Sequence, residues 1–195
     1  MATNKIVKIG YGQVEPNRLT AQRTKEVFAQ LPAASSIPVI ENGMAMVYDQ
    51  VKGEVRFAKD ASEKVCLVMT EINLPDPDHQ ADSDFAIFHR PETAYQVEMK
   101  AYPRLFALHK GDTFTTNTVK IDTKHADASS SPVPAGTLFA VDTDGYWVQV
   151  GTPATGYATN TNVQVACVKD YTLADGQRAL KMVVTAVNDG AVSAA

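Results

Sequence analysis

The chain has few of the residues that build disulfide frameworks and metal-dependent active sites. Its 195 residues include two cysteines and four histidines. Cys66 and Cys167 each lie within an apolar run, where a thiol usually acts as a small buried hydrophobe. Two such distant cysteines form no disulfide framework, so we predict two buried free thiols and a reducing compartment.

Long apolar runs are also absent from the sequence. No run approaches the roughly 20 residues that a membrane-spanning helix needs. Residues 1–8 contain no apolar block of the kind found in secretion signals. We therefore expect a chain that folds in a cytoplasm and makes no membrane contact.

The charge of the chain does not favour nucleic-acid binding. The net charge is −4, whereas proteins that wrap nucleic acid usually present a basic face, so we expect no direct nucleic-acid partner. Charge is unevenly spread, however, because residues 1–36 hold more basic than acidic side chains: Lys5, Lys8, Arg18, Arg23 and Lys25 against Glu15 and Glu26. Two interpretations of this segment stay open: binding to an acidic partner surface, and a solvated helix face.

Catalytic signatures are missing as well. No histidine belongs to a His-x-Glu or His-Glu-x-x-His zinc signature. No glycine-rich phosphate loop and no Gly-x-Ser-x-Gly nucleophile elbow occurs. A serine or cysteine nucleophile would need a partnered histidine, which the sequence does not place. We therefore predict that the protein is not an enzyme and carries no cofactor.

Residues 73–84 come nearest to a metal site. Four carboxylates surround His79 there, those of Asp76, Asp78, Asp82 and Asp84. Such a density suits a hard cation such as calcium. Gln80 and Ala81 break the EF-hand spacing, so a solvated loop is the favoured interpretation and a calcium site is the alternative.

Residues 1–36 have the pattern of an N-terminal arm. A short strand is expected around Ile6, Val7 and Ile9. The apolar spacing of residues 19–31 predicts a helix, which Pro32 ends. Residues 33–36 then predict a flexible joint.

The rest of the chain alternates short apolar stretches with turn residues, which is the pattern of a β-rich fold. We predict a mainly β protein: a small β-barrel or sandwich-like module, with an N-terminal arm carrying a short helix and an inserted β-rich segment. Residues 37–72 plus 131–187 form the β-domain, residues 73–130 the insertion and residues 188–195 a flexible tail. In its core we expect five residues of neighbouring strands to be buried: Val65, Leu67, Val68, Val165 and Val168.

Residues 37–72 and 131–172 show the same order of turns and strands. In each block a glycine-containing turn and an aspartate precede a second glycine, and a cysteine-bearing strand follows: Gly43, Asp49, Gly53 and Cys66 against Gly136, Asp142, Gly145 and Cys167. The order fits an internal duplication. It also fits a simple β-meander, in which turns recur at similar spacing, and both interpretations stay open.

Residues 131–172 carry the most informative stretch of the sequence. After Pro-Ala-Gly-Thr, an apolar strand at residues 138–141 leads to the turn Asp142-Thr143-Asp144-Gly145 and to a returning strand. The turn opens like a calcium loop, but the position of the final carboxylate is Pro153, so we predict a hairpin turn. On the returning strand, Trp147 points to the face opposite Tyr146 and Val148.

This stretch of sequence resembles the small β-domain of tailed-bacteriophage capsid decoration (head-stabilising) proteins. The Pro-Ala-Gly-Thr opening, the Asp-x-Asp-Gly hairpin and the Val-rich strand carry the resemblance, which covers residues 131–187 and, more loosely, 37–72. It implies a structural virion protein that binds the outside of the capsid and stabilises or decorates the shell. The implied partners are the major capsid protein and further copies of the chain, a trimer among the options. The helix-bearing arm and the insertion depart from the compact members of the family.

The residues that we expect at the interface with the shell are Arg18, Arg23, Lys25, Phe28 and Trp147. The implied location is the capsid surface, after assembly in the host cytoplasm. The main alternative is a carbohydrate- or cell-surface-binding β-module of a phage tail or fibre. In that alternative Tyr146 and Trp147 would form a stacking platform, whereas a core or protein-interface position is the commoner role of Trp.

Overall fold

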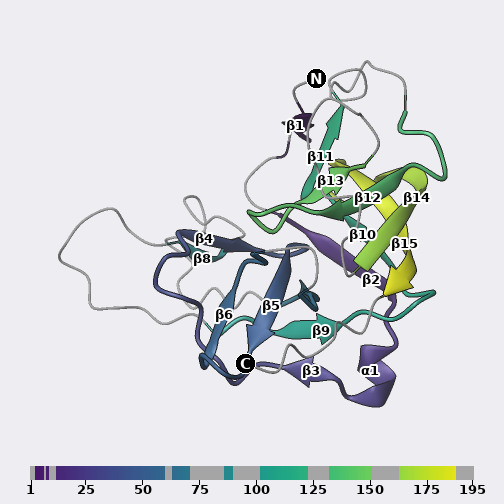
Figure 1. Ribbon diagram of the computed structural model, residues 1–195. Helices are drawn as coiled ribbons and strands as arrows, with labels where there is room; N and C mark the ends of the chain where they lie inside the picture. Colours follow the sequence, from purple (N-terminus) through teal and green to yellow (C-terminus); the bar gives the residue numbers. More distant parts are fainter. Residues whose placement is uncertain are drawn as a thin grey trace.

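A computed structural model describes residues 3–6, 8, 12–59, 63–70, 86–89, 102–122, 132–150 and 163–187. The fold is mainly β, as predicted, with two large sheets and a single helix of four residues, α1 (Ala21–Thr24), among the described residues (Figure 1). The described part of the chain contains no helix with the length and apolar character needed to cross a membrane.

The larger sheet has eight strands in the order β1-β11-β13-β12-β14-β15-β10-β2. Their bounds are β1 (Thr3–Lys5), β2 (Val14–Arg18), β10 (Thr113–Thr116), β11 (Val119–Asp122), β12 (Leu138–Val141), β13 (Trp147–Gln149), β14 (Val163–Thr172) and β15 (Arg178–Val187). Only Asn117 and Thr118 separate β10 from β11, although these strands lie near opposite edges of the sheet. Such a short link requires the sheet to curl strongly, but the described edge strands β1 and β2 do not pair into a closed barrel.

The smaller sheet has five antiparallel strands in the order β3-β9-β7-β5-β6. Their bounds are β3 (Val27–Phe28), β5 (Ala45–Asp49), β6 (Glu54–Arg56), β7 (Cys66–Val68) and β9 (Leu105–Ala107), and beside them β4 (Val39–Glu41) pairs with β8 (Ala86–His89). The very apolar β7 occupies the centre of its sheet.

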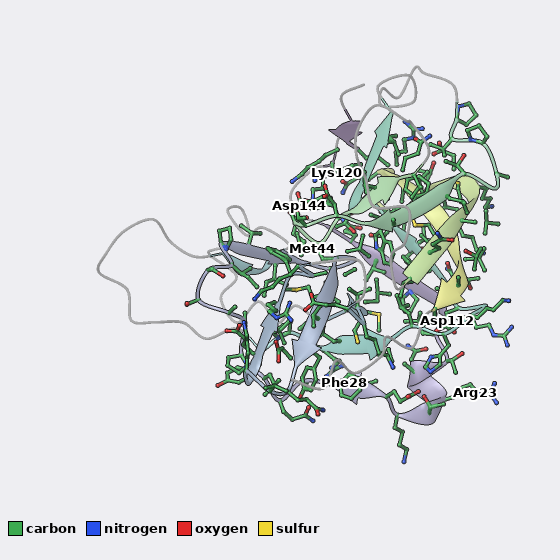
Figure 2. All side chains as sticks on the ribbon, in the orientation of Figure 1. Arg23, Phe28, Met44, Asp112, Lys120 and Asp144 are labelled. Carbon is green, nitrogen blue, oxygen red and sulfur yellow. The ribbon has the colours of Figure 1, made fainter. Side chains whose placement is uncertain are left out.

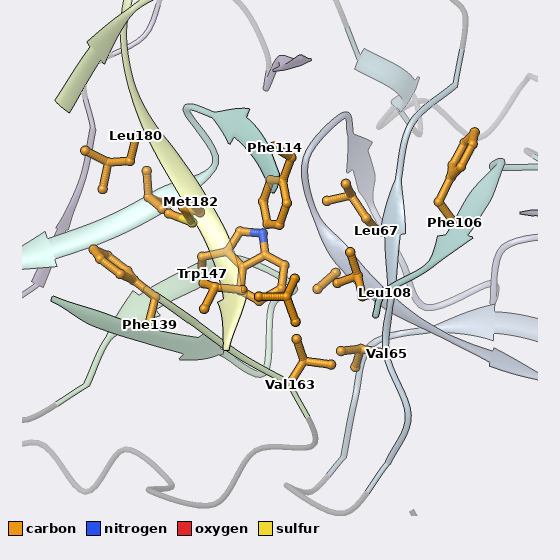
Figure 3. Packing of buried hydrophobic residues seen from close by; sticks show 14 of the residues in the cluster. Val65, Leu67, Phe106, Leu108, Phe114, Phe139, Trp147, Val163, Leu180 and Met182 are labelled. Carbon is orange, nitrogen blue, oxygen red and sulfur yellow. The ribbon is translucent and has the colours of Figure 1, made fainter. Parts of the chain in front are cut away.

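The two sheets pack face to face over one apolar core. Leu67 of the smaller sheet lies near Phe114 and Trp147 of the larger one in this core (Figure 3). Ala45 and Val47 of the smaller sheet belong to the same cluster. Alternate residues of the same strands, among them Met46, Cys66 and Val68, enter a second cluster on the other side of the smaller sheet. The five-stranded sheet is therefore covered on both faces, and the arrangement is sandwich-like.

Gly43 marks a point where the two sheets are joined. The Trp147 indole N–H donates to the Gly43 carbonyl oxygen at 2.9 Å. Gly43 has a φ of 88°, and a Cβ at this position would lie 2.0 Å from Thr116 Oγ1. Only glycine satisfies both the left-handed backbone and the close approach.

The domain boundaries drawn from the sequence are not those of the structure. Residues 1–36 do not form a separate arm, because β1 and β2 lie in the larger sheet and β3 in the smaller one. Residues 105–122 of the expected insertion likewise supply strands to both sheets, namely β9, β10 and β11. The local patterns were informative, but long-range pairing decides which sheet a strand joins.

The helix predicted at residues 19–31 is also shorter in the structure. It ends after one turn, because Lys25 takes a left-handed conformation with a φ of 64° and Val27 and Phe28 then pair with β9. The acidic loop at residues 73–84 and the tail at residues 188–195 lie outside the described residues.

The blocks at residues 37–72 and 131–172 occupy different sheets, yet their strands follow the same local order. In each, a central strand pairs with a hairpin partner on one side and with a cysteine-bearing strand on the other, all antiparallel. A fourth strand then flanks the cysteine-bearing one, which makes β6-β5-β7-β9 equivalent to β13-β12-β14-β15. Duplication and meander both predict this order.

Candidate functional site

Three of the five residues expected at an interface lie close together along the chain on one exposed edge. Arg18 ends β2, Arg23 lies in the last turn of α1 and Lys25 follows that helix, and all three residues are exposed. Figure 2 shows Arg23 on α1. Lys110, also exposed, belongs to the turn that binds the start of α1. We call Arg18, Arg23, Lys25 and Lys110 the basic edge.

Asp112 fixes the basic edge to the body of the protein. Its buried carboxylate accepts hydrogen bonds from the Thr20 backbone N–H at 2.8 Å, the Thr20 hydroxyl at 2.6 Å and the His109 backbone N–H at 2.9 Å. Thr20 immediately precedes α1, so one carboxylate holds the helix against the turn at residues 109–112. Hydrogen bonds therefore hold the edge in place against the sheets, and the edge is not part of the separate N-terminal arm that the sequence predicted.

Glu26 adds a second attachment beyond α1. Its backbone carbonyl accepts from the Ala107 N–H at 3.1 Å, and its carboxylate lies 2.9 Å from His109 Nε2. The Thr24 hydroxyl donates to the same carboxylate at 2.6 Å and, with His109 nearby, lowers the pKa of Glu26 below its ordinary value. The segment carrying Arg23 and Lys25 is thus held at both ends.

Several other basic side chains among the described residues are tied to carboxylates. Lys120 lies between Asp142 and Asp144 at 2.5 and 2.7 Å, and Arg178 meets Asp170 at 2.6 Å. Arg56 pairs with both Asp49, at 2.8 Å, and Glu63. In the described part of the chain, no carboxylate lies within ion-pair distance of the four residues of the basic edge. Their charge is therefore available to a partner.

Phe28 and Trp147 do not belong to that exposed edge. Phe28 is half-buried and stacks on Tyr48 with 4.9 Å between ring centroids. Trp147 is fully buried in the core, 5.4 Å from the ring of Phe114. The expectation of Trp147 at an interface is wrong for this conformation, because both faces of β13 are covered: Tyr146 and Val148, on the opposite side, are buried too.

A buried ionic cluster that the sequence did not indicate joins three segments of the chain. Glu41 accepts a hydrogen bond from the Tyr146 hydroxyl at 2.6 Å and forms an ion pair with Lys8. The Lys8 ammonium also donates to the Tyr146 hydroxyl at 3.0 Å. We call these three residues the Lys8–Glu41–Tyr146 cluster.

Burial dominates the titration of this cluster. It lowers the pKa of Lys8, against the opposing effect of Glu41, and it raises the pKa of Tyr146, an effect that Glu41 reinforces. Tyr146 therefore stays protonated at neutral pH and remains a donor to Glu41. All three polar groups satisfy one another, so the arrangement is suited to holding segments together. No sequence motif links positions 8, 41 and 146, which is why sequence reasoning missed the cluster.

The turn at residues 142–145 is a hairpin, as predicted. The Gly145 N–H donates to the Asp142 carbonyl at 3.0 Å, and Gly145 has a φ of 81°. The carboxylates of Asp142 and Asp144 hold Lys120. Among the described residues, no group of three His, Cys, Asp or Glu side chains is arranged to hold a metal ion.

Both cysteines are buried free thiols, which confirms the prediction. Burial raises the pKa of Cys66 to about 12 and that of Cys167 to about 11. Thiols with such pKa values stay protonated at neutral pH and are poor nucleophiles.

Comparisons with known proteins add no relative. A scan against protein-family models, a search of curated proteins and a search of solved structures each found no match.

Proposed function

We propose that this chain is a structural virion protein that binds the outside of a bacteriophage capsid and stabilises or decorates the shell. The resemblance of residues 131–187 to capsid decoration proteins suggests the class of protein. One structural observation carries the proposal further: the basic edge is exposed and rigid, and no described carboxylate pairs with it.

A rigid basic edge suits docking on an acidic protein surface. Complementary charges speed the encounter and fix the orientation of the partners. Because Asp112 already orders the start of α1, binding does not have to order that segment. A flexible arm with the same charges would lose more conformational entropy on docking.

The proposed partner is the major capsid protein, and the proposed location is the capsid surface. A module of this size can link neighbouring shell subunits through interfaces of about 1,600 Å² each. Several copies, or a homo-oligomer such as a trimer, would strengthen attachment through multivalency without a single tight contact. In this role the protein needs no cofactor and performs no catalysis.

The alternative of a carbohydrate-binding tail or fibre module has less support. It depended on an aromatic platform formed by Tyr146 and Trp147, and both rings are buried. No other described feature favours it.

Co-sedimentation with DNA-free shells, prepared from particles that lack the protein, tests the proposal. The triple variant Arg18→Glu, Arg23→Glu, Lys25→Glu should bind shells at least about tenfold more weakly, since opposed like charges cost binding energy. The double variant Lys52→Glu, Lys59→Glu changes two exposed lysines near the β5–β6 hairpin and should bind like the unaltered protein.

Raising the salt concentration should weaken binding of the unaltered protein, because exposed charges are screened. A failure of the unaltered protein to sediment with shells would overturn the proposal. Deleting residues 1–31 is not a clean test, because it would remove β1, β2 and β3 from the two sheets.

A further inference from the structure

The side of the eight-stranded sheet that faces away from the core carries two continuous rows of residues. Residues directly opposite each other on paired strands point to the same face. One row therefore runs Leu138, Ala166, Val183, Thr113, Arg18 across β12, β14, β15, β10 and β2. The next row runs Lys169, Lys181, Thr115, Glu15, and Thr115 in this row is buried. We call these rows, with Val168 between them, the outer face.

A β-bulge in β14 creates part of the outer face. Val163, Val165 and Cys167 point into the core, so strict alternation would return Lys169 to the core as well. The register instead shifts between Cys167 and Lys169, and Val168 and Lys169 both become exposed. Bulges redirect side chains in this way at the cost of local pairing.

Two large apolar side chains are exposed on adjacent strands of the outer face. Val168 is 41% exposed and Leu138 is 39% exposed, which makes them two of the four large apolar side chains that are exposed among the described residues. They lie on adjacent strands, because Leu138 is opposite Ala166 and Val168 follows two residues later on β14. Half-buried Val183 continues this apolar centre on β15.

The charges on the outer face are mainly basic, although the chain as a whole has a net charge of −4. Arg18, Lys169 and Lys181 stand against one carboxylate, that of Glu15 at the β2 edge. Lys169 and Lys181 are directly opposite each other, an arrangement that destabilises an isolated sheet. An acidic partner would relieve this repulsion.

We propose that the outer face docks on an acidic protein surface, with Leu138 and Val168 at the apolar centre of the contact and Arg18, Lys169 and Lys181 around it. Within the proposed function, on which this inference rests, that partner surface is the exterior of the shell. Arg18 belongs to both the outer face and the basic edge, so the two form one continuous docking surface. Pairing of two copies through this face would oppose lysines to lysines and is disfavoured. A phosphate backbone would leave the apolar centre without a partner.

The experiment compares two lysine pairs in the intact protein. The variant Lys169→Glu, Lys181→Glu reverses the charge of the outer face, and Lys52→Glu, Lys59→Glu makes the same change near the β5–β6 hairpin. The first variant should bind DNA-free shells about tenfold more weakly, whereas the second should bind within about twofold of the unaltered protein. The first variant replaces one like-charged pair with another and loses only the contact of Lys169 with the Tyr171 ring, so its thermal unfolding midpoint should change little, which separates docking from folding.

If the unaltered protein and both variants bind shells equally well, the outer face is not the docking surface, but the proposed function still stands. No shell binding by the unaltered protein would overturn both. Binding to duplex DNA, binding to vesicles of anionic lipid and self-association are measured with the same proteins. If the Lys169→Glu, Lys181→Glu variant binds shells normally but loses binding to DNA, binding to vesicles or self-association, the partner of the outer face is not an acidic protein.

Discussion

The units β6-β5-β7-β9 and β13-β12-β14-β15 have the same strand order but differ in what covers them. In the first, Met46, Cys66 and Val68 of the face turned away from the larger sheet pack into an apolar cluster. In the second, the corresponding face leaves Leu138 and Val168 exposed. A shared order of strands therefore does not determine burial. One unit is therefore covered on both faces, whereas the other leaves part of one face exposed.

One of the two largest expected effects tests the link between β4 and the segment that precedes β13. In the Lys8–Glu41–Tyr146 cluster, Glu41→Gln removes the charge that compensates a largely buried ammonium. Removing one partner of a buried ion pair lowers the free energy of unfolding by about 3–5 kcal/mol. We expect the lower end of this range because Lys8 keeps some solvent contact. Urea unfolding measures this loss, and a change below about 1 kcal/mol, the value usual for exposed pairs, would show that the cluster is not a joint.

A matched pair of leucines tests the difference in burial directly. Leu67→Ala should lower the free energy of unfolding by about 2–5 kcal/mol, because Leu67 is fully buried between the sheets. Leu138→Ala, on the outer face, should change it by no more than about 0.5 kcal/mol. Equal losses in the two variants would contradict the comparison, since they would mean that both faces are packed alike.

Substitution of Lys169 should weaken docking on the shell without lowering the stability of the fold. The single variant Lys169→Glu converts a like-charged cross-strand pair into a Glu–Lys pair, a gain of about 0.2–1 kcal/mol that offsets the loss of the Lys169 contact with the Tyr171 ring, so the fold should not be destabilised. The same variant should bind shells more weakly. A lysine kept only for the fold would give the opposite result, with lower stability and unchanged binding.

The smallest effect concerns the hairpin aspartate of the covered unit. The Lys52 backbone N–H and then Arg56 lower the pKa of Asp49 below its ordinary value of 3.8. A carboxyl group with a depressed pKa contributes stability that is present above its ordinary pKa and is lost as the pH falls through its value in the folded protein. The advantage of the unaltered protein over Asp49→Asn should therefore shrink between about pH 5 and about pH 2. A constant difference over this range would show that Asp49 does not titrate as stated.

Local chemistry made some of the fold predictable from the sequence. Alternating apolar residues indicated the β-rich class, and the strand at residues 138–141 and the turn that ends in Gly145 were both found from local signals. Cys66 and Cys167 were recognised as buried thiols because their neighbours are apolar. Each of these features depends on a few adjacent residues.

Features that depend on long-range pairing were not predictable in this way. Residues 27–28 fit a helical face in sequence, but β9 offers them a strand partner. Val168 was expected in the core, and the bulge at Cys167/Lys169 turns it outward. The pairing of Lys169 with Lys181 did have a local signal, since both are equally far from Asp175 in the turn between β14 and β15. Assigning that hairpin first would have revealed the outer face.

Image reconstruction of particles assembled with and without the protein tests the central claim most directly. We expect additional density on the outside of the shell only when the protein is present, with the larger sheet and the basic edge against the shell. The variant Lys169→Glu, Lys181→Glu should leave that density weaker. Identical shells with and without the protein, or density confined to a tail or fibre, would contradict the proposed function.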